Sequence, residues 1–263
     1  MAGDLFVRSW PVPAGVERRG SVVIVHGLGE HSGRYEHVGV HLATHGYAAR
    51  AFDHRGHGAS PGSRGGLETS AGMLDDLAAV FAADSGETPF LLGHSLGGAV
   101  AAQAVTSGRL VPRGLILSSP ALRLWLSRAQ RGLLAAGLRV APDRPVPNRL
   151  PLDKLSHDPA VVAAYRADPQ VHDRITPRLT RFLLDAGAAA RRDARRCTVP
   201  TLLLVSGQDQ LVDARGAREF AAALAPGVGT LRVYDDLFHE LFNEREPDRG
   251  RVLADLVAWL AEH

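Results

Sequence analysis

The chain has 263 residues, 45% hydrophobic and 22% charged, which suits one large α/β domain or a core with an insertion. No apolar run approaches the ~20 residues of a membrane span, and the first residues lack a basic segment followed by an apolar stretch, so we expect neither a transmembrane helix nor a secretory leader. The net charge of +2, with arginines scattered among acids, argues against a nucleic-acid partner, and a lone cysteine, Cys197, fits a cytoplasmic chain, at most peripheral at membranes.

The first 120 residues alternate apolar strands with amphipathic helices. We expect strands at residues 5–10, 21–25, 47–52, 89–92 and 114–119, and helices at 33–45, 69–83 and 99–105. The strands are solidly apolar instead of alternating with polar residues. This pattern predicts a mostly parallel central sheet flanked by helices on both faces.

The alternation stops between Pro120 and Arg196, where we expect helices and no strand. An amphipathic helix over 121–141 would place Trp125 and Leu126 on its apolar face, and shorter helices are expected at 160–167 and 177–190. We interpret residues 121–195 as a helical cap over the C-terminal strand ends, because a single crossover does not need so long a segment. The alternative is an ordinary stretch of sheet-covering helix.

The strand–helix alternation resumes after the cap. A buried strand over 199–207 leads to Asp209, a helix over 213–224 precedes a strand over 230–234, and a last helix is expected over 248–261. We therefore expect one core built from residues 1–120 and 196–263.

One pentapeptide, Gly93-His94-Ser95-Leu96-Gly97, lies between an expected strand and an expected helix. A serine in so tight a corner needs small neighbours, and the corner presents its hydroxyl beside a helix N-terminus. This is the nucleophile-elbow pattern, so Ser95 is the candidate nucleophile.

A serine nucleophile needs a base, and the base needs an acid that holds its tautomer. Asp209 and His239 each follow a strand at the rim where the loops of a parallel sheet meet, and they follow Ser95 in the usual nucleophile–acid–histidine order. Competing histidines and acids lie in less suitable places: His26, His54, His57, His94, Asp213, Asp235 and Asp236.

The oxyanion of an acyl-transfer reaction needs two preorganised donors. We expect the backbone N–H groups of Leu96, directly after the nucleophile, and of Leu28, in the loop after the 21–25 strand. The segment Asp53-His54-Arg55-Gly56-His57-Gly58 matches no specific metal-ligand spacing, so we expect no metal and no cofactor.

Three segments carry a resemblance to a known family: residues 26–35 (HGLGEHSGRY), 53–60 (DHRGHGAS) and 93–98 (GHSLGG). They resemble the monoacylglycerol lipase and lysophospholipase branch of the α/β-hydrolases, of the serine aminopeptidase S33 type, and the similarity extends through 199–209 and 234–240. The resemblance implies an eight-stranded type of α/β-hydrolase core with a helical cap, and hydrolysis of a fatty-acyl glycerol ester. It also implies catalytic roles for Ser95, Asp209 and His239, and an oxyanion hole at Leu28 and Leu96. The family's leading strand is not evident here, and the cap matches loosely.

We therefore expect a serine hydrolase that cleaves monoacylglycerol or lysophospholipid through an acyl-enzyme on Ser95. Trp125 and Leu126 would accept the acyl chain and could touch a lipid surface, or they could only pack the cap onto the core. A short-chain carboxylesterase and a serine aminopeptidase or amidase are the alternatives within hydrolases. A non-catalytic ligand-binding scaffold is the alternative of another class.

Overall fold

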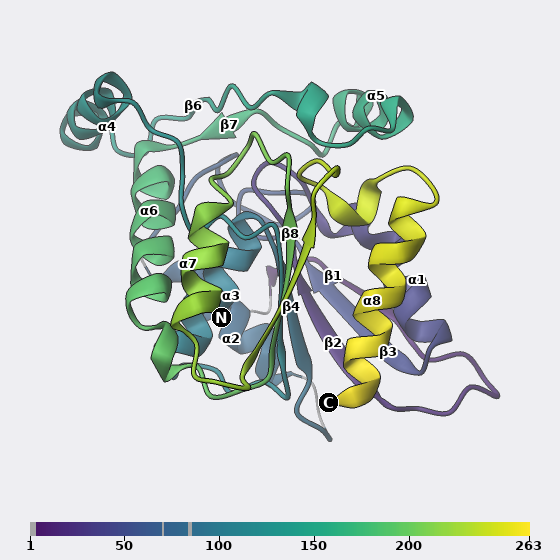
Figure 1. Cartoon of the computed structure of the whole chain (residues 1–263). Coiled ribbons are helices and arrows are strands. Elements are labelled where there is room, and N and C mark those ends of the chain that lie inside the picture. The colour runs from purple at the N-terminus through teal and green to yellow at the C-terminus, as the bar shows by residue number, and fades with distance from the viewer. Residues whose placement is uncertain (1–3, 70, 84–85) are drawn as a thin grey trace.

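The computed structural model describes residues 4–69, 71–83 and 86–263 (Figure 1). Two expectations fall partly outside this range. Residues 1–3 belong to the stretch on which we base the absence of a leader, and Ser70 belongs to the helix expected over 69–83. All other predicted elements lie within the described ranges.

A seven-stranded sheet forms the centre of the described chain, in the order β1-β3-β2-β4-β5-β8-β9. Only β1 runs antiparallel to its neighbour, so the expected mostly parallel sheet is confirmed. The resemblance implied an eight-stranded type, and the described sheet has one strand fewer. The strands are β1 (Val7–Trp10), β2 (Gly20–Val25), β3 (Tyr47–Phe52), β4 (Phe90–His94), β5 (Leu115–Ser118), β8 (Thr201–Ser206) and β9 (Gly229–Tyr234).

Helices cover both faces of this sheet (Figure 1). Successive side chains of one strand enter opposite apolar layers: Val22 and Ile24 face one layer, Val23 and Val25 the other. Both sides of a strand are therefore buried, which explains the solidly apolar runs in the sequence. One face carries α1 (Glu36–Thr44) and α8 (Asp248–Glu262), and the other carries α2 (Gly72–Ala82), α3 (Leu96–Thr106), α6 (Pro177–Arg192) and α7 (Arg215–Ala223).

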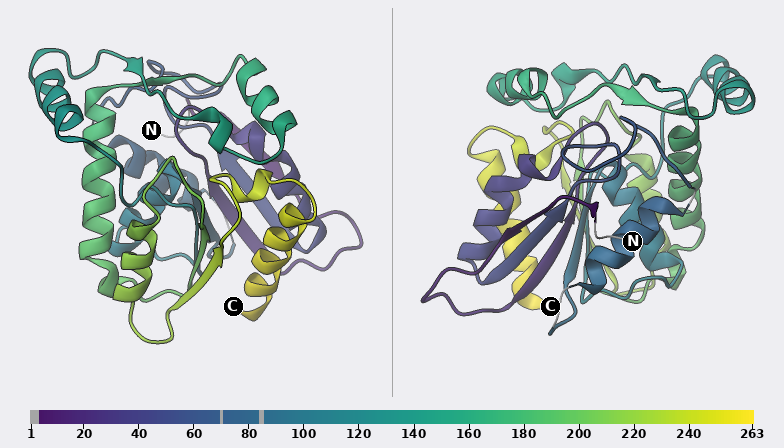
Figure 2. Two further views of the ribbon diagram at one scale, coloured as in Figure 1. Left: turned by 45° about the horizontal axis from the view of Figure 1, so that its top comes forward. Right: turned by 180° about the vertical axis from the view of Figure 1, so that it is seen from behind.

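A separate layer lies across the C-terminal ends of the strands (Figure 2). It contains α4 (Arg128–Val140), β6 (Val146–Pro147), the 3-10 turn η3 (Leu152–Lys154), α5 (Pro159–Ala167) and β7 (Arg174–Ile175). The antiparallel pair β6–β7 corrects our expectation of no strand in this segment. Its two pairs of residues are too short a ribbon to leave a recognisable alternation. The described residues also include the 3-10 turns η2 (Ser32–Tyr35), η4 (Ala194–Arg196) and η5 (Leu241–Asn243).

The expected helix over 121–141 is shorter than predicted. It begins at Arg128, because the Ser127 and Gln130 side chains form a reciprocal capping box at its N-terminus. The preceding residues are not helical, and Leu122 is buried there against the backbones of α6 and α7. Trp125 and Leu126 consequently precede α4 and do not lie on its apolar face.

The last helix of the expected cap lies beside the sheet. α6 packs along α3 and α7 and buries its apolar side there (Figure 1). Thr176, fully buried, caps its first turn by accepting from the amide of Leu179. We therefore propose that the cap covers residues 121–176 and that α6 belongs to the core.

Candidate active site

Ser95 lies at the sharp corner between β4 and α3. Its backbone, with φ 51° and ψ −116°, occupies a region that L-residues rarely adopt. A Cβ on Gly93 would lie 2.5 Å from the carbonyl oxygen of Gly97, and one on Gly97 would lie 2.2 Å from that of Val25. Only glycine fits at either position, as the sequence pattern indicates, and the corner holds Ser95 half-buried at the end of the strand.

His239 and Asp209 form a hydrogen-bonded pair. The imidazole Nδ1 lies 2.7 Å from the carboxylate Oδ2, and both side chains are buried. The other oxygen, Oδ1, accepts from the amides of Leu211 and Val212, each at 2.9 Å, which fixes the orientation of the carboxylate. Although burial works against ionisation, His239 and these amides hold the pKa of Asp209 below its usual value. Asp209 is therefore an ionised carboxylate that is hydrogen-bonded to the imidazole of His239.

The electrostatic surroundings of His239 would suit a general base. Burial alone would lower its pKa, but Asp209, with Glu240 and Glu30 as further carboxylates, raises the pKa above its ordinary value. The ring of His94, the residue before Ser95, lies 4.8 Å from that of His239. Burial and the neighbouring His239 lower the pKa of His94 to about 4, so His94 is neutral at physiological pH. The serine corner and the histidine loop thus meet at one rim.

The loop after β2 approaches the serine closely. A Cβ on Gly27 would lie 3.3 Å from the Cβ of Ser95, and the Gly27 amide donates to Glu30 Oε1 at 2.5 Å. Because the Gly27 amide is occupied, the next amide, that of Leu28, is the candidate donor of this loop. Leu96, at the first position of α3, is the candidate donor on the other side, where helical geometry offers it no partner.

The histidines of the glycine-rich segment pack against the loop after β2. The rings of His26 and His54 lie 4.4 Å apart, and the His54 amide donates to His26 Nε2. Asp53 accepts from the amides of Ser32 and Ala59, so it ties together two loops beside Ser95. Burial, first of all, holds the pKa values of His26, His54 and His57 well below the ordinary value.

The expected substrate-binding pair is not brought into this constellation. The indole of Trp125 is 53% exposed and lies under the guanidinium of Arg215, 5.0 Å away, beside α7. Leu126 is partly buried in the same connecting segment. No described contact joins either residue to Ser95 or His239.

A buried ionic network that the sequence did not reveal lies next to the site. Arg34 contacts two carboxylates, those of Glu30 and Glu240. A third buried carboxylate, Glu244, accepts from the Phe238 amide at 2.7 Å and thus holds the loop that carries His239. One signal was available: Glu240 directly follows His239, and a charged residue beside a buried catalytic position needs a partner.

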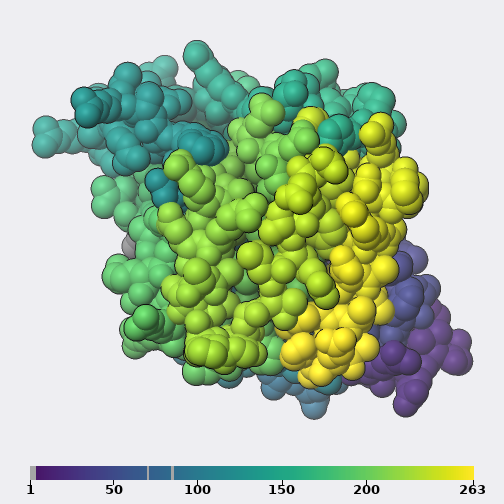
Figure 3. All heavy atoms as spheres, in the orientation of Figure 1, coloured from purple at the N-terminus to yellow at the C-terminus, as the bar shows by residue number. Residues whose placement is uncertain are grey.

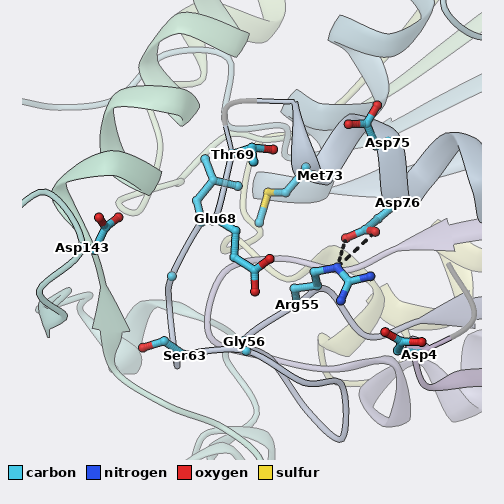
Figure 4. Close-up of a pocket in the computed structure, with 14 residues that line it drawn as sticks. Asp4, Arg55, Gly56, Ser63, Glu68, Thr69, Met73, Asp75, Asp76 and Asp143 are labelled. Carbon is cyan, nitrogen blue, oxygen red and sulfur yellow. Dashed lines mark hydrogen bonds and ion pairs between the residues drawn. The ribbon is translucent and has the colours of Figure 1, made fainter. Parts of the chain in front are cut away.

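A cavity of about 650 Å³ lies between the glycine-rich segment, α2 and the cap (Figure 4). Arg55 crosses it to Asp76, with 3.1 Å between Nε and Oδ2. The lining residues do not include Ser95, Asp209 or His239. Several carboxylates lie in the lining and suit an acyl chain poorly: Asp4, Glu68, Asp75, Asp76 and Asp143.

The fold and the geometry at Ser95 define an α/β-hydrolase. A family model described as serine aminopeptidase, S33, matches residues 16–246. The chain therefore belongs to the serine aminopeptidase S33 family, in its branch similar to monoacylglycerol lipases, and is a serine ester hydrolase.

Three relatives illustrate this similarity. A monoacylglycerol lipase of Mycolicibacterium smegmatis is 35% identical over 93% of this chain and 89% of its own. A phospholipase of Bacillus subtilis is 32% identical over 86% of this chain and 89% of its own. The crystal structure of Paleococcus ferrophilus monoacylglycerol lipase superimposes with a TM-score of 0.90 at 33% identity, over 98% of this chain and 99% of that one.

Proposed function

We propose that this protein hydrolyses fatty-acid monoesters, monoacylglycerol or lysophospholipid, through an acyl-enzyme on Ser95. The observation that carries the proposal is the hydrogen-bonded His239–Asp209 pair at the rim where the strained Ser95 lies. The monoacylglycerol lipases among the relatives support the substrate class.

The hydrogen bond to Asp209 sets the tautomer of His239. Nδ1–H donates to the carboxylate, which leaves Nε2 free to accept the hydroxyl proton of Ser95. The serine oxygen attacks the acyl carbonyl, and the amides of Leu28 and Leu96 stabilise the oxyanion. The glycerol oxygen takes the proton from His239 as its bond to the acyl carbon breaks. A water molecule, deprotonated by the same nitrogen, then releases the fatty acid and restores Ser95.

Lysophospholipid is the second substrate of this proposal, since a phospholipase is among the relatives. A short-chain carboxylesterase or an aminopeptidase would use the same three side chains. Those functions differ in the acyl pocket and in the leaving group, not in the reaction at Ser95. A non-catalytic scaffold would have no use for the hydrogen-bonded orientation of His239.

A panel of substrates tests the proposal. We expect turnover of monoacylglycerols with long acyl chains to exceed that of acetyl or butyryl p-nitrophenyl esters and of aminoacyl amides. A fluorophosphonate probe should label the wild-type protein but not Ser95→Ala, which should lose hydrolysis. Full activity of Ser95→Ala would refute the assignment of the nucleophile, and an optimum at butyryl esters without monoacylglycerol turnover would refute the substrate class.

We further propose that α4 brings the cap to anionic lipid surfaces. Every residue of this helix is exposed or half-buried, and the exposed fractions of Leu133 and Val140 are 75% and 85%. Ala129, Leu133, Ala136 and Val140 form one exposed apolar stripe at helical spacing. Arginines at 128, 131 and 139, with no acidic residue in the helix, match a negatively charged bilayer. In Figure 3 this part of the cap projects at the upper left.

A further inference from the structure

A buried ionic bridge connects the two loops that flank Ser95. On one side, Glu30 Oε1 accepts from the Gly27 amide at 2.5 Å and from the Tyr35 hydroxyl at 2.8 Å. Glu30 therefore holds the loop that precedes the Leu28 amide. Its second oxygen, Oε2, accepts from Arg34 Nη1 at 2.7 Å.

On the other side, the same guanidinium reaches the residue after His239. Arg34 Nη1 and Nη2 each lie 2.6 Å from one carboxylate oxygen of Glu240, a parallel bidentate pair. Glu240 is further fixed by Asn243 Nδ2, at 2.9 Å from Oε2, and by its own amide, which donates to the Leu155 carbonyl at 2.8 Å. The bridge thus ends on the backbone that carries His239.

The bridge is protected from water. The exposed fraction is 10% for the Arg34 side chain and 4% for each of the two glutamates. From the cap, the Tyr165 ring covers the guanidinium, with 4.6 Å between its centroid and the Arg34 Cζ. Buried ion pairs gain little net stability, but removing one partner leaves an uncompensated buried charge. Such a pair therefore adds little to the stability of the fold, but it fixes the relative positions of the segments that it joins.

We propose that Arg34 is a positioning residue for the reaction: through Glu30 and Glu240 it fixes the separation between the Leu28 loop and the His239 loop. This inference rests on the proposed function, because it presumes that Leu28 and His239 act on the same acyl group. A displacement of about 1 Å between such groups can lower a rate about 100-fold.

Arg34→Met and Arg34→Lys test the proposal on the full chain with a monoacylglycerol. We expect Arg34→Met to lower kcat about 100-fold with KM nearly unchanged. Arg34→Lys should recover part of the loss, because an ammonium keeps the charge but cannot form the fork. Arg55→Met is the matched control, since Arg55 is a partly buried arginine paired with Asp76 away from Ser95. It should keep kcat near the wild-type value.

Glu240→Gln adds the pH profile of kcat/KM to the kinetic comparison. Asp209, Glu240 and Glu30 face His239 with negative charge, and His94 is its neutral neighbour. Glu240→Gln should shift the acid limb of kcat/KM to lower pH, whereas Arg34→Met, which leaves both carboxylates uncompensated, should shift it to higher pH. In the double variant, the loss of kcat should be smaller than the product of the two single losses.

The outcomes separate this inference from the proposed function. If wild type is inactive on every ester, or Ser95→Ala stays active, the proposed function fails whatever Arg34 does. If wild type is active and Ser95→Ala is not, but kcat of Arg34→Met matches that of Arg55→Met, the positioning role is wrong. All activities are measured at a temperature well below Tm. They are divided by the concentration of protein that the fluorophosphonate probe labels. Should Arg34→Met not fold, unchanged kcat and pH profiles for Arg34→Lys and Glu240→Gln overturn the inference equally.

Discussion

At the scale of single residues, the site depends on backbone that only a few side chains permit. Ser95 holds a positive φ between Gly93 and Gly97, whose missing Cβ atoms let β4 and α3 meet without collision. The surrounding parallel strands hold the corner in place and so compensate the cost of this strained backbone. The corner is recognisable in the sequence because only glycine fits at the two positions that flank Ser95.

Asp209 and Asp213 offer a sharp test of the acid. Asp209→Asn removes the charge that holds the Nδ1–H tautomer of His239, so we expect kcat to fall roughly 10⁴-fold. Asp213 lies four residues along the same segment and is buried, but it pairs with Arg123 and Arg215. Asp213→Asn should keep kcat near the wild-type value. Steady-state kinetics at pH 8 measures both, and equal losses would contradict the assignment.

The candidate site could be predicted from sequence where local rules apply. Ser95 follows from turn chemistry, and Asp209 and His239 follow from their places after parallel strands. Arg34 could not be found in this way, because its partners Glu30 and Glu240 meet it only through the fold. The pairing of residues 206 positions apart has no signature in a single sequence.

At the scale of elements, the central sheet and α5 were predictable, whereas the start of α4 and the β6–β7 pair were not. Strands that are buried on both faces appear in the sequence as apolar runs, whatever the arrangement of the loops that connect them. The cap elements are short and their ends depend on tertiary contact, as for Leu122, which is buried against α6 and α7. The capping box of Ser127 and Gln130 was a legible signal for the true start of α4, and the helical periodicity upstream of it was misleading.

The exposed stripe of α4 can be tested by introducing negative charge. Replacing Leu133 and Val140 together by glutamate places two negative charges on the face proposed to meet an anionic bilayer. At about 1 kcal/mol per charge, binding to phosphatidylglycerol vesicles should weaken about 30-fold, as measured by cosedimentation. Val111→Glu, at a position 66% exposed and outside the cap, is the control and should bind like wild type.

Two further results decide what this α4 test means. Hydrolysis of a dissolved ester should be unchanged in the double variant, because Ser95 and His239 are untouched. Equal vesicle binding by wild type and double variant would refute the role of α4. Among the described residues no helix is long and apolar enough to cross a bilayer.

At the scale of the whole molecule, buried histidines make stability depend on pH. His26, His54 and His57 have pKa values well below 6.5 in the folded state, mainly because of burial. As pH falls below 6.5, the unfolded chain binds protons that the folded chain refuses, so stability falls. In this range each histidine lowers the free energy of unfolding by about 1.4 kcal/mol for each unit that the pH falls. The three together lower it by about 4 kcal/mol per pH unit.

His239 acts in the opposite sense. Its folded-state pKa is raised, so its contribution to stability is present below pH 6.5 and is lost as pH rises through the folded value. We expect urea unfolding, followed by tryptophan fluorescence, to give a steep loss of unfolding free energy between pH 6 and pH 5. His57→Gln should reduce that slope by about one proton. Identical slopes in wild type and His57→Gln would contradict the explanation.

The cap differs in how its two halves are joined to the core, and this difference bears on how such enzymes diversify. Tyr165 and Asp168 tie the α5 half to Arg34 and His31, beside the catalytic loops. The α4 half touches the core mainly through α6. We therefore expect exchanges within residues 127–150 to leave the loops around Ser95 and His239 in place. New substrate ranges should arise there first.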